Sequence, residues 1–487
     1  MANNPKIDLS EIKRKSFLGA VALTGRTFLL QIIALAATLI LTILLDPTVF
    51  GIFFVVTAVV NFLNYFSDIG LAAALIQKQT EPDATDYKST FTLQQILVIT
   101  AVVVASFLTP VIGRIYNFGD SGLFLFRALI IAFFLSSLKT IPSVMLEREL
   151  EFGKLVWPQI VETVVYYLTA IILAFLGLGI VSFAWAAIFR GISGVIALYL
   201  VKPWIPQIGL SKSSIRSLLT FGVPYQGNAL LALIKDDLVI AYLGTILPFA
   251  AIGYIGWAKK WAEIALRLIM DNIIKVTFPT FSRLQHDREF LKNAINKSLK
   301  VLTLFTLPIA IGMVFMVRPL IEIIPRYEKW QPALLSFYLF TFSAVLATLS
   351  SPLVNALNAI GKVKYTFYLM LLWTVLTWIT VPILVNLYGF NGVAIAAFII
   401  GITSLIPLFI VKKFVPISLF DQIIVPLKGS LLLGCVLIIF KILISNAAAY
   451  LVLGTLAGGL IYSVYCYKNL KTELLPYVKL IFTKTQK

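Results

Sequence analysis

The feature that most constrains the fold is a series of long apolar runs, each followed by a short polar connection. A helix needs about 20 apolar residues to cross the hydrocarbon core of a bilayer, and these runs have that length. With 60% hydrophobic and 13% charged residues, the chain lies outside the composition of soluble domains. The sequence therefore predicts an all-α polytopic membrane protein with about 14 transmembrane helices. We expect the spans at 18–45, 50–77, 90–112, 123–144, 155–176, 180–201, 217–243, 250–277, 296–324, 332–356, 365–386, 390–411, 427–445 and 448–467.

The distribution of Lys and Arg among the connections predicts the orientation. With a cytoplasmic N-terminus, nearly all of these residues fall on the cytoplasmic side, and the outer side receives few of them. By the positive-inside rule, both termini are expected in the cytoplasm. Much of the formal net charge of +18 then faces the anionic lipid of the inner leaflet, so it requires no nucleic-acid partner.

The sequence offers no motif for catalysis or metal binding. The two cysteines, Cys435 and Cys466, lie in apolar runs, and the single histidine, His286, lies in a polar loop. A disulfide framework and a metal site are therefore not expected. The outer connections are too short to form a catalytic domain, and no phosphate-binding glycine-rich loop occurs. We expect a protein that is not an enzyme and uses no cofactor, with its function in the membrane-embedded part.

A weak internal repeat predicts two lobes. ILLDPTVFGIFF and YLGTILPFAAIGYI both place a proline and then a glycine at the turn into the next span. Two parallel repeats of six spans, related by an axis along the membrane normal, are an architecture of rocking transporters. The predicted parts are a cytoplasmic N-terminal segment (1–16), an N-lobe of six spans (17–201), a cytoplasmic connector (202–216), a C-lobe of six spans (217–412), an interfacial segment with the last two spans (413–467) and a cytoplasmic tail (468–487).

The stretch 253–279 is long enough to span a bilayer, yet it carries six charged residues, most of them four apart and alternating in sign. On a helix, four of the six fall within about 80° of one another, and the opposite side is apolar. Insertion scales put one such charge at the bilayer centre at roughly 2.5 to 3.5 kcal/mol. We therefore expect the charged side to face a water-filled interior. The six residues are Lys259, Lys260, Glu263, Arg267, Asp271 and Lys275.

Further polar residues concentrate in the first, second and seventh spans, so that the first pair of spans in each repeat carries most of the polar load. Those predicted to bind substrate are Arg26, Asn61, Asn64, Lys235, Asp236 and Asp237. Glu162 and Arg190 are isolated in 155–176 and 180–201. Taken singly, we interpret these two as structural.

Two interpretations of the charges are open. Neighbours four residues apart could neutralise one another and hold helices together. However, the charges of 253–279 sum to +2, and Arg26 adds another, whereas a structural network is expected to close at zero. Surplus positive charge suits phosphate, which Arg and Lys recognise. Acidic and amide groups nearby could bind sugar hydroxyls, and Trp257 could stack on a sugar face or belong to the core.

Three sets of segments resemble the polysaccharide transporter family. They are LDPTVFGIFF…FSDIGLAAALIQKQ, SVMLERELEFGKL, and FGVPY…KDDLVIAYLG…IGYIGWAKKWAE…TFPTFSRLQ, and the resemblance covers about residues 15 to 415. This family is the branch of the multidrug/oligosaccharidyl-lipid/polysaccharide exporter superfamily that contains O-antigen, colanic-acid and teichuronic-acid flippases. The resemblance implies two lobes in the bacterial inner membrane that move undecaprenyl-diphosphate-linked oligosaccharide outward by alternating access. It also implies a central cationic cavity into which Arg26 and the region of Lys259 and Lys260 project.

The residues and the resemblance together predict a flippase for lipid-linked oligosaccharide. The residues expected to hold the diphosphate are Arg26, Lys259, Lys260 and Arg267, and those expected to bind sugar or a coupling cation, Na⁺ or H⁺, are Glu263, Asp271, Asp236 and Asp237. The alternative is a cation-coupled, multidrug-type exporter of small molecules, whose cavity should be rich in carboxylates. A third hypothesis is a membrane scaffold for polysaccharide assembly. Expected partners are membrane lipids, the lipid-linked glycan and proteins of polysaccharide polymerisation.

Overall fold

The computed structural model describes residues 9–78 and 80–484, and within these ranges the regular structure is helical throughout. The chain divides into two compact units, Met1–Gly253 and Tyr254–Lys487. The helices of the first unit are α1 (Leu9–Leu44), α2 (Pro47–Asp68), α3 (Leu71–Gln77), α4 (Ala84–Tyr116), α5 (Gly119–Ser137), α6 (Thr140–Arg148), α7 (Phe152–Phe175), α8 (Val181–Val201), α9 (Lys212–Ile246) and the start of α10 (Phe249–Leu284). The second unit contains the rest of α10, α11 (Arg288–Ile323), the 3₁₀ helix η1 (Glu328–Ala333), α12 (Leu334–Ala359), α13 (Val363–Tyr388), α14 (Asn391–Thr403), α15 (Ile406–Lys412), α16 (Leu419–Leu443) and α17 (Ala447–Lys484).

The prediction of an all-α polytopic membrane protein is confirmed. Among the described residues, 12 helical segments are long and apolar enough to cross a membrane. Each of the predicted spans falls on one helix or on two consecutive helices. The two predicted spans outside that apolar set, 217–243 and 250–277, correspond to α9 and α10, which carry the charged clusters.

Three predicted spans, 50–77, 123–144 and 390–411, are interrupted, the last of them between α14 and α15. The run 50–77 breaks between α2 and α3, where Ile69 and Gly70 adopt left-handed backbone conformations with φ of 43° and 75°. A Cβ on Gly70 would overlap the backbone of Gly222 in α9, so a glycine is required by both the φ angle and the close approach. The run 123–144 breaks after α5, and its last residues belong to the short helix α6.

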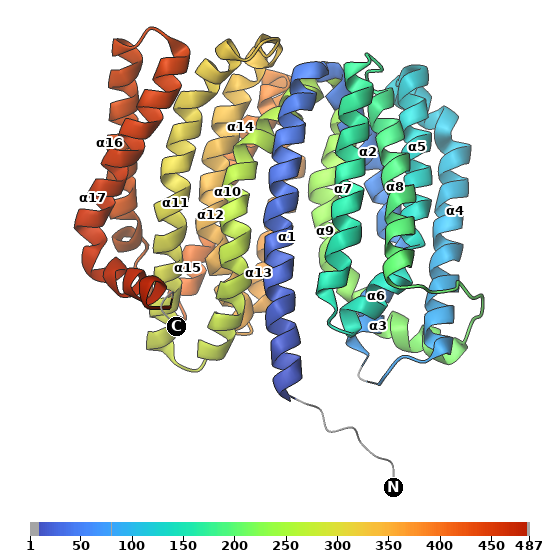
Figure 1. The fold of residues 1–487 in the computed structure, drawn as a ribbon. Coiled ribbons are helices and arrows are strands. Elements are labelled where there is room, and N and C mark those ends of the chain that lie inside the picture. Colours follow the sequence, from blue (N-terminus) through green and yellow to red (C-terminus); the bar gives the residue numbers. More distant parts are fainter. Residues whose placement is uncertain (1–8, 79, 485–487) are drawn as a thin grey trace. The chain divides into compact units, whose positions relative to one another are not determined.

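In the first unit, α7 and α8 form a tightly packed hairpin, with α1 against α7 and α5 against α8 (Figure 1). The helix α9 packs against α2, α3 and α4. The first unit therefore includes a helix that lies beyond the connector 202–216 in the sequence. The proposed division into two six-span lobes stays a prediction.

The two turns of the internal repeat meet each other. Gly51 lies four residues after the first residue of α2, Pro47, and Gly253 lies four residues after the first residue of α10, Phe249. A Cβ on Gly51 would overlap the carbonyl group of Phe249, and a Cβ on Gly253 would overlap that of Pro47. Because each glycine abuts the start of the other helix, the contact is reciprocal, as expected of equivalent turns in a repeat.

In the second unit, α11 packs against α12, α16 and α17, and α12 packs against α13, α14 and α15. Its buried aromatic residues include Trp257 of α10, whose ring stacks on Trp330 with centroids 5.4 Å apart. The Trp257 indole N–H donates to the hydroxyl of Tyr327 at 3.1 Å. Of the two roles open to Trp257, the structure shows the core role.

The motifs behind the family resemblance meet at the short helices of the first unit. Leu71 and Leu75 of α3 pack against Ile141 and Val144 of α6 in one buried cluster. The guanidinium group of Arg148, at the end of α6, donates to the carbonyl oxygens of Leu75, Ile76, Lys78 and Thr80 at 2.6 to 3.4 Å. Arg148 thereby satisfies carbonyls that the last turn of α3 leaves without intrahelical partners.

Replacing Arg148 should therefore destabilise this corner of the first unit. Hydrogen bonds from a charged donor contribute about 1.5 to 3 kcal/mol, so Arg148→Ala should lower the thermal unfolding midpoint by several degrees in detergent. Lys154→Ala is the matched control, because it removes a basic residue whose side chain is 55% exposed in its pair with Glu151. Equal midpoints for the two variants would contradict the capping role.

Candidate functional site

The charged side of α10 lies opposite its buried side, as the sequence predicts. Ala258, Ala262 and Leu266 are at most 1% exposed. On the other side, Lys260, Arg267 and Lys275 are exposed, and Lys259, Glu263 and Asp271 are partly buried. The prediction that this side lines a hydrated chamber between two lobes stays a prediction.

Mutual neutralisation along α10 is incomplete. Arg267 and Glu263 form an ion pair at 2.9 Å, in which the Arg267 side chain is 60% exposed. Within the described part of the chain, neither Asp271 nor Lys275 has an ion-pair partner. The structural interpretation, in which neighbours four residues apart cancel all along the helix, therefore does not hold at Asp271 and Lys275, the C-terminal end of this series.

The polar residues of α2 and α9 meet in the first unit. The Asn61 amide donates to the Asp237 carboxylate at 2.9 Å, and Lys235 forms an ion pair with Asp236 at 2.8 Å. Asn64 lies on the exposed side of α2. Asp236 and Asp237 thus have protein partners already, while the Asp236 side chain stays 47% exposed.

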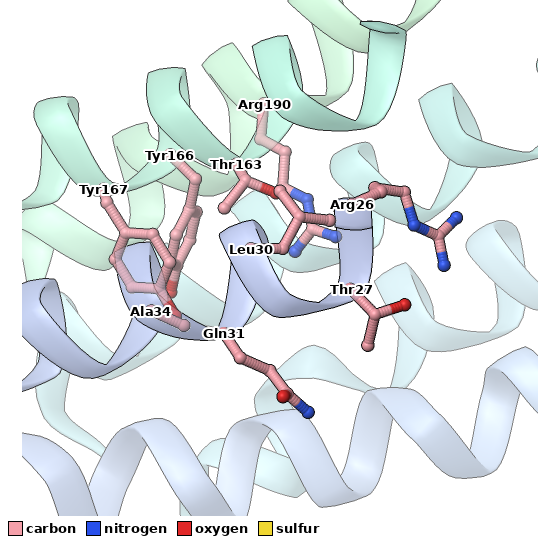
Figure 2. Close-up of a pocket in the computed structure, with 9 residues that line it drawn as sticks. All are labelled: Arg26, Thr27, Leu30, Gln31, Ala34, Thr163, Tyr166, Tyr167 and Arg190. Carbon is pink, nitrogen blue, oxygen red and sulfur yellow. The ribbon is translucent and has the colours of Figure 1, made fainter. Parts of the chain in front are cut away.

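A polar pocket lies between α1, α7 and α8 (Figure 2). It consists of two adjoining cavities of about 290 and 320 Å³, which share Arg26, Leu30, Thr163 and Arg190 as lining residues. Figure 2 shows the Arg190 side chain reaching from α8 toward α1, close to Leu30 and Thr163. Of the predicted site residues, only Arg26 lines this pocket.

An ion-pair network fixes one wall of the pocket. The Glu162 carboxylate accepts from the Lys139 ammonium at 2.5 Å and lies 3.6 Å from Nε of Arg190. Glu162 is only 8% exposed, and a Cβ on Gly194 would overlap its carboxylate. The glycine therefore leaves room for a buried carboxylate between α7 and α8.

Two further polar contacts in the pocket involve arginines. Arg26 donates to the side-chain oxygen of Gln159, and the guanidinium carbon of Arg190 lies 5.7 Å from the centre of the Tyr166 ring, within cation–π range. With Lys139, the pocket holds three cationic side chains against the single carboxylate of Glu162. Its surplus of two positive charges suits an anionic ligand.

The interpretation of Glu162 and Arg190 as isolated residues is wrong, because helix packing brings them together with Lys139. Lys139 and Gln159 are pocket residues that the sequence analysis did not identify. The signal available in the sequence was a polar residue inside each of the apolar runs 123–144, 155–176 and 180–201. Nothing in the sequence indicated that these residues share one site.

Comparison with known proteins gives concordant results. A family model described as "Polysaccharide biosynthesis protein" matches residues 40–335. The succinoglycan biosynthesis transport protein ExoT of Rhizobium meliloti is 24% identical over 94% of this chain and 93% of its own. The lipopolysaccharide biosynthesis protein WzxC of Escherichia coli is 22% identical over 73% of this chain and 72% of its own. Among solved structures, the lipid II flippase MurJ in an inward closed conformation superimposes with a TM-score of 0.76 at 18% identity, covering 94% of this chain and 100% of MurJ.

The buried ion pair of the pocket leads to a stability prediction. The Lys139 and Glu162 side chains are 15% and 11% exposed, so Glu162→Leu leaves a buried ammonium with no carboxylate. Breaking a buried pair in this way costs about 3 to 5 kcal/mol. We expect a large fall in the thermal unfolding midpoint in detergent, and recovery of most of it in the double variant Lys139→Met/Glu162→Leu. A double variant no more stable than Glu162→Leu would contradict the pairing.

Proposed function

The chain belongs to the polysaccharide biosynthesis protein family, among the polysaccharide transporters of the multidrug/oligosaccharidyl-lipid/polysaccharide exporter superfamily, and from this membership we propose that it is a flippase. Its substrate is an oligosaccharide repeat unit linked through a diphosphate to undecaprenol. It moves this substrate across the bacterial inner membrane by alternating access. As a transporter it performs no catalytic reaction.

The observation that carries the substrate class is the exposed cationic side of α10. Lys260, Arg267 and Lys275 are exposed on a helix whose length suits a membrane span. Inserting one such charged residue at the centre of the bilayer costs roughly 2.5 to 3.5 kcal/mol. Several of them on one helix therefore indicate that this side faces a polar path through the membrane. Surplus basic residues on that path favour a phosphate-bearing substrate.

The predicted roles of the residues of α10 fit this proposal, whereas those of Asp236 and Asp237 do not. Lys259, Lys260 and Arg267 bind the diphosphate, and Glu263 and Asp271 bind sugar hydroxyls. Asp236 and Asp237 are already bonded to Lys235 and Asn61, which favours a role for α9 in joining helices of the first unit. A coupling cation, Na⁺ or H⁺, would require carboxylates with few competing partners, and Asp271 is the best candidate for it.

The surroundings of the protein follow from the same proposal. Both termini lie in the cytoplasm, where most of the Lys and Arg in the connections meet the anionic leaflet. The undecaprenyl tail stays in lipid while the polar head crosses. The proteins that polymerise repeat units on the outer face are the expected partners.

Complementation of a flippase-deleted bacterial host tests the function. Lys260→Ala and Arg267→Ala should each lower surface polysaccharide about tenfold or more, because a charged hydrogen bond of 1.5 to 3 kcal/mol is lost to the substrate. Arg283→Ala, in the last turn of the same helix, is the control and should export normally. The readout is surface polysaccharide per cell, normalised to the amount of protein in the membrane.

Undiminished export by both variants would refute the assignment of α10 to the diphosphate. Failure of the unaltered protein to restore export, together with increased resistance of the cells to organic cations, would instead indicate a multidrug-type exporter.

A further inference from the structure

We propose that the pocket between α1, α7 and α8 is a binding site for the phosphate group of a lipid, with Arg26 and Arg190 as the phosphate-binding residues. The inference rests on the proposed function and extends it, because it places a phosphate site wholly within the first unit. All residues that line the pocket come from helices of that unit or from the junction of α5 and α6. No residue of α10 is required.

The first step of the argument is the charge of the pocket. Lys139, Arg26 and Arg190 face one carboxylate, Glu162, and the surplus of two positive charges lies among membrane helices. In surroundings of low dielectric constant, such a surplus is costly unless an anion or water compensates it. A phosphodiester headgroup or a diphosphate supplies compensating negative charge, and the diphosphate supplies more of it.

The second step is that the cations have different roles. Lys139 and Glu162 form an ion pair in which the side chains are only 15% and 11% exposed. We therefore assign both residues to the wall of the pocket and not to ligand binding. Arg190 is 54% exposed and lies at a looser 3.6 Å from Glu162. Its Nη groups are therefore available to a ligand while Glu162 and the Tyr166 ring orient it.

Arg26 supplies the second guanidinium. It donates to a neutral partner, the Gln159 amide, and among the described residues its buried Nε has no hydrogen-bond partner. The side-chain oxygen of Gln31, also in the pocket lining, is buried and lacks a partner in the same part of the chain. Guanidinium groups bind phosphate oxygens in a bidentate manner, so Arg26 of α1 and Arg190 of α8 give the pocket lining two groups of this kind.

The third step is the size of the pocket. Cavities of about 290 and 320 Å³ lie at the small end of the range for ligand sites. They accommodate a headgroup phosphate or diphosphate, and an oligosaccharide must remain outside. The aromatic rings of Tyr166 and Tyr167 line one cavity and offer a surface for the first sugar or for the start of the lipid chain.

Two lipids carry this chemistry, namely the undecaprenyl diphosphate carrier and an ordinary anionic phospholipid. Binding to the purified full-length chain in detergent, followed by native mass spectrometry, separates them. The probes are undecaprenyl diphosphate, phosphatidylglycerol and undecaprenol, which lacks phosphate. We expect both phosphate lipids to bind more tightly than undecaprenol. If undecaprenyl diphosphate binds more tightly than phosphatidylglycerol, the site belongs to the transported lipid. If phosphatidylglycerol binds more tightly, the site belongs to the membrane phospholipid.

The variants identify the site. Arg26→Gln and Arg190→Gln should each weaken binding of the preferred phosphate lipid about tenfold, as expected for a lost charged hydrogen bond. Arg190→Lys should recover part of the lost affinity, because lysine restores the positive charge but not the planar guanidinium group that binds phosphate in a bidentate manner. Arg127→Gln is the matched control, since it removes an exposed arginine of α5 that does not line the pocket.

Equal binding by Arg26→Gln, Arg190→Gln and Arg127→Gln would overturn the proposal, as would binding of undecaprenol as tight as that of the diphosphate. Thermal unfolding of each variant shows whether it is folded. If Arg190→Gln does not fold, binding by Arg190→Lys is compared with that of the unaltered protein instead. Complementation in parallel separates this proposal from the flippase assignment. Normal export with unchanged binding refutes the pocket alone, whereas phosphate binding by a protein that fails to restore export refutes the flippase assignment alone.

Discussion

An ionised side chain among membrane helices needs a partner of opposite charge or access to water, and this requirement organises the polar residues of the chain. In the first unit, Glu162 is buried between α7 and α8 and is held by Lys139. Without Lys139, the only ion-pair partner of Glu162 among the described residues would be the more exposed Arg190, at 3.6 Å. Gly194 leaves the space that this carboxylate fills. The two other cationic side chains, Arg26 and Arg190, then give the pocket a net positive charge.

The fold follows from local patterns to a large extent. Each long apolar run forms helix because a helix satisfies the backbone groups of a segment in hydrocarbon within that segment itself. The breaks are different in origin. At Ile69 and Gly70 the chain turns through left-handed conformations next to Gly222, a residue about 150 positions away. A single glycine in an apolar run does not reveal such a contact, so the break between α2 and α3 could not be predicted from the sequence.

The candidate site also has a part that the sequence predicts and a part that only helix packing determines. On α10, the repeat of charges every four residues places Lys260 and Arg267 on one side of one helix, and this depends on helical geometry alone. The pocket depends on which helices are neighbours. Lys139, Glu162 and Arg190 come from three different helical regions, and their positions in the sequence do not connect them. Their convergence is set by packing of α5 and α7 against α8, which periodicity does not encode.

The reciprocal contact of Gly51 with Phe249 and of Gly253 with Pro47 has an evolutionary consequence. A larger residue at either glycine displaces the first turn of the other helix. The effect of a mutation in one repeat therefore depends on the backbone of the other repeat. The two halves can drift apart over most of their length, but at these turns they must change together or not at all. Glycine is therefore expected to be retained at both turns.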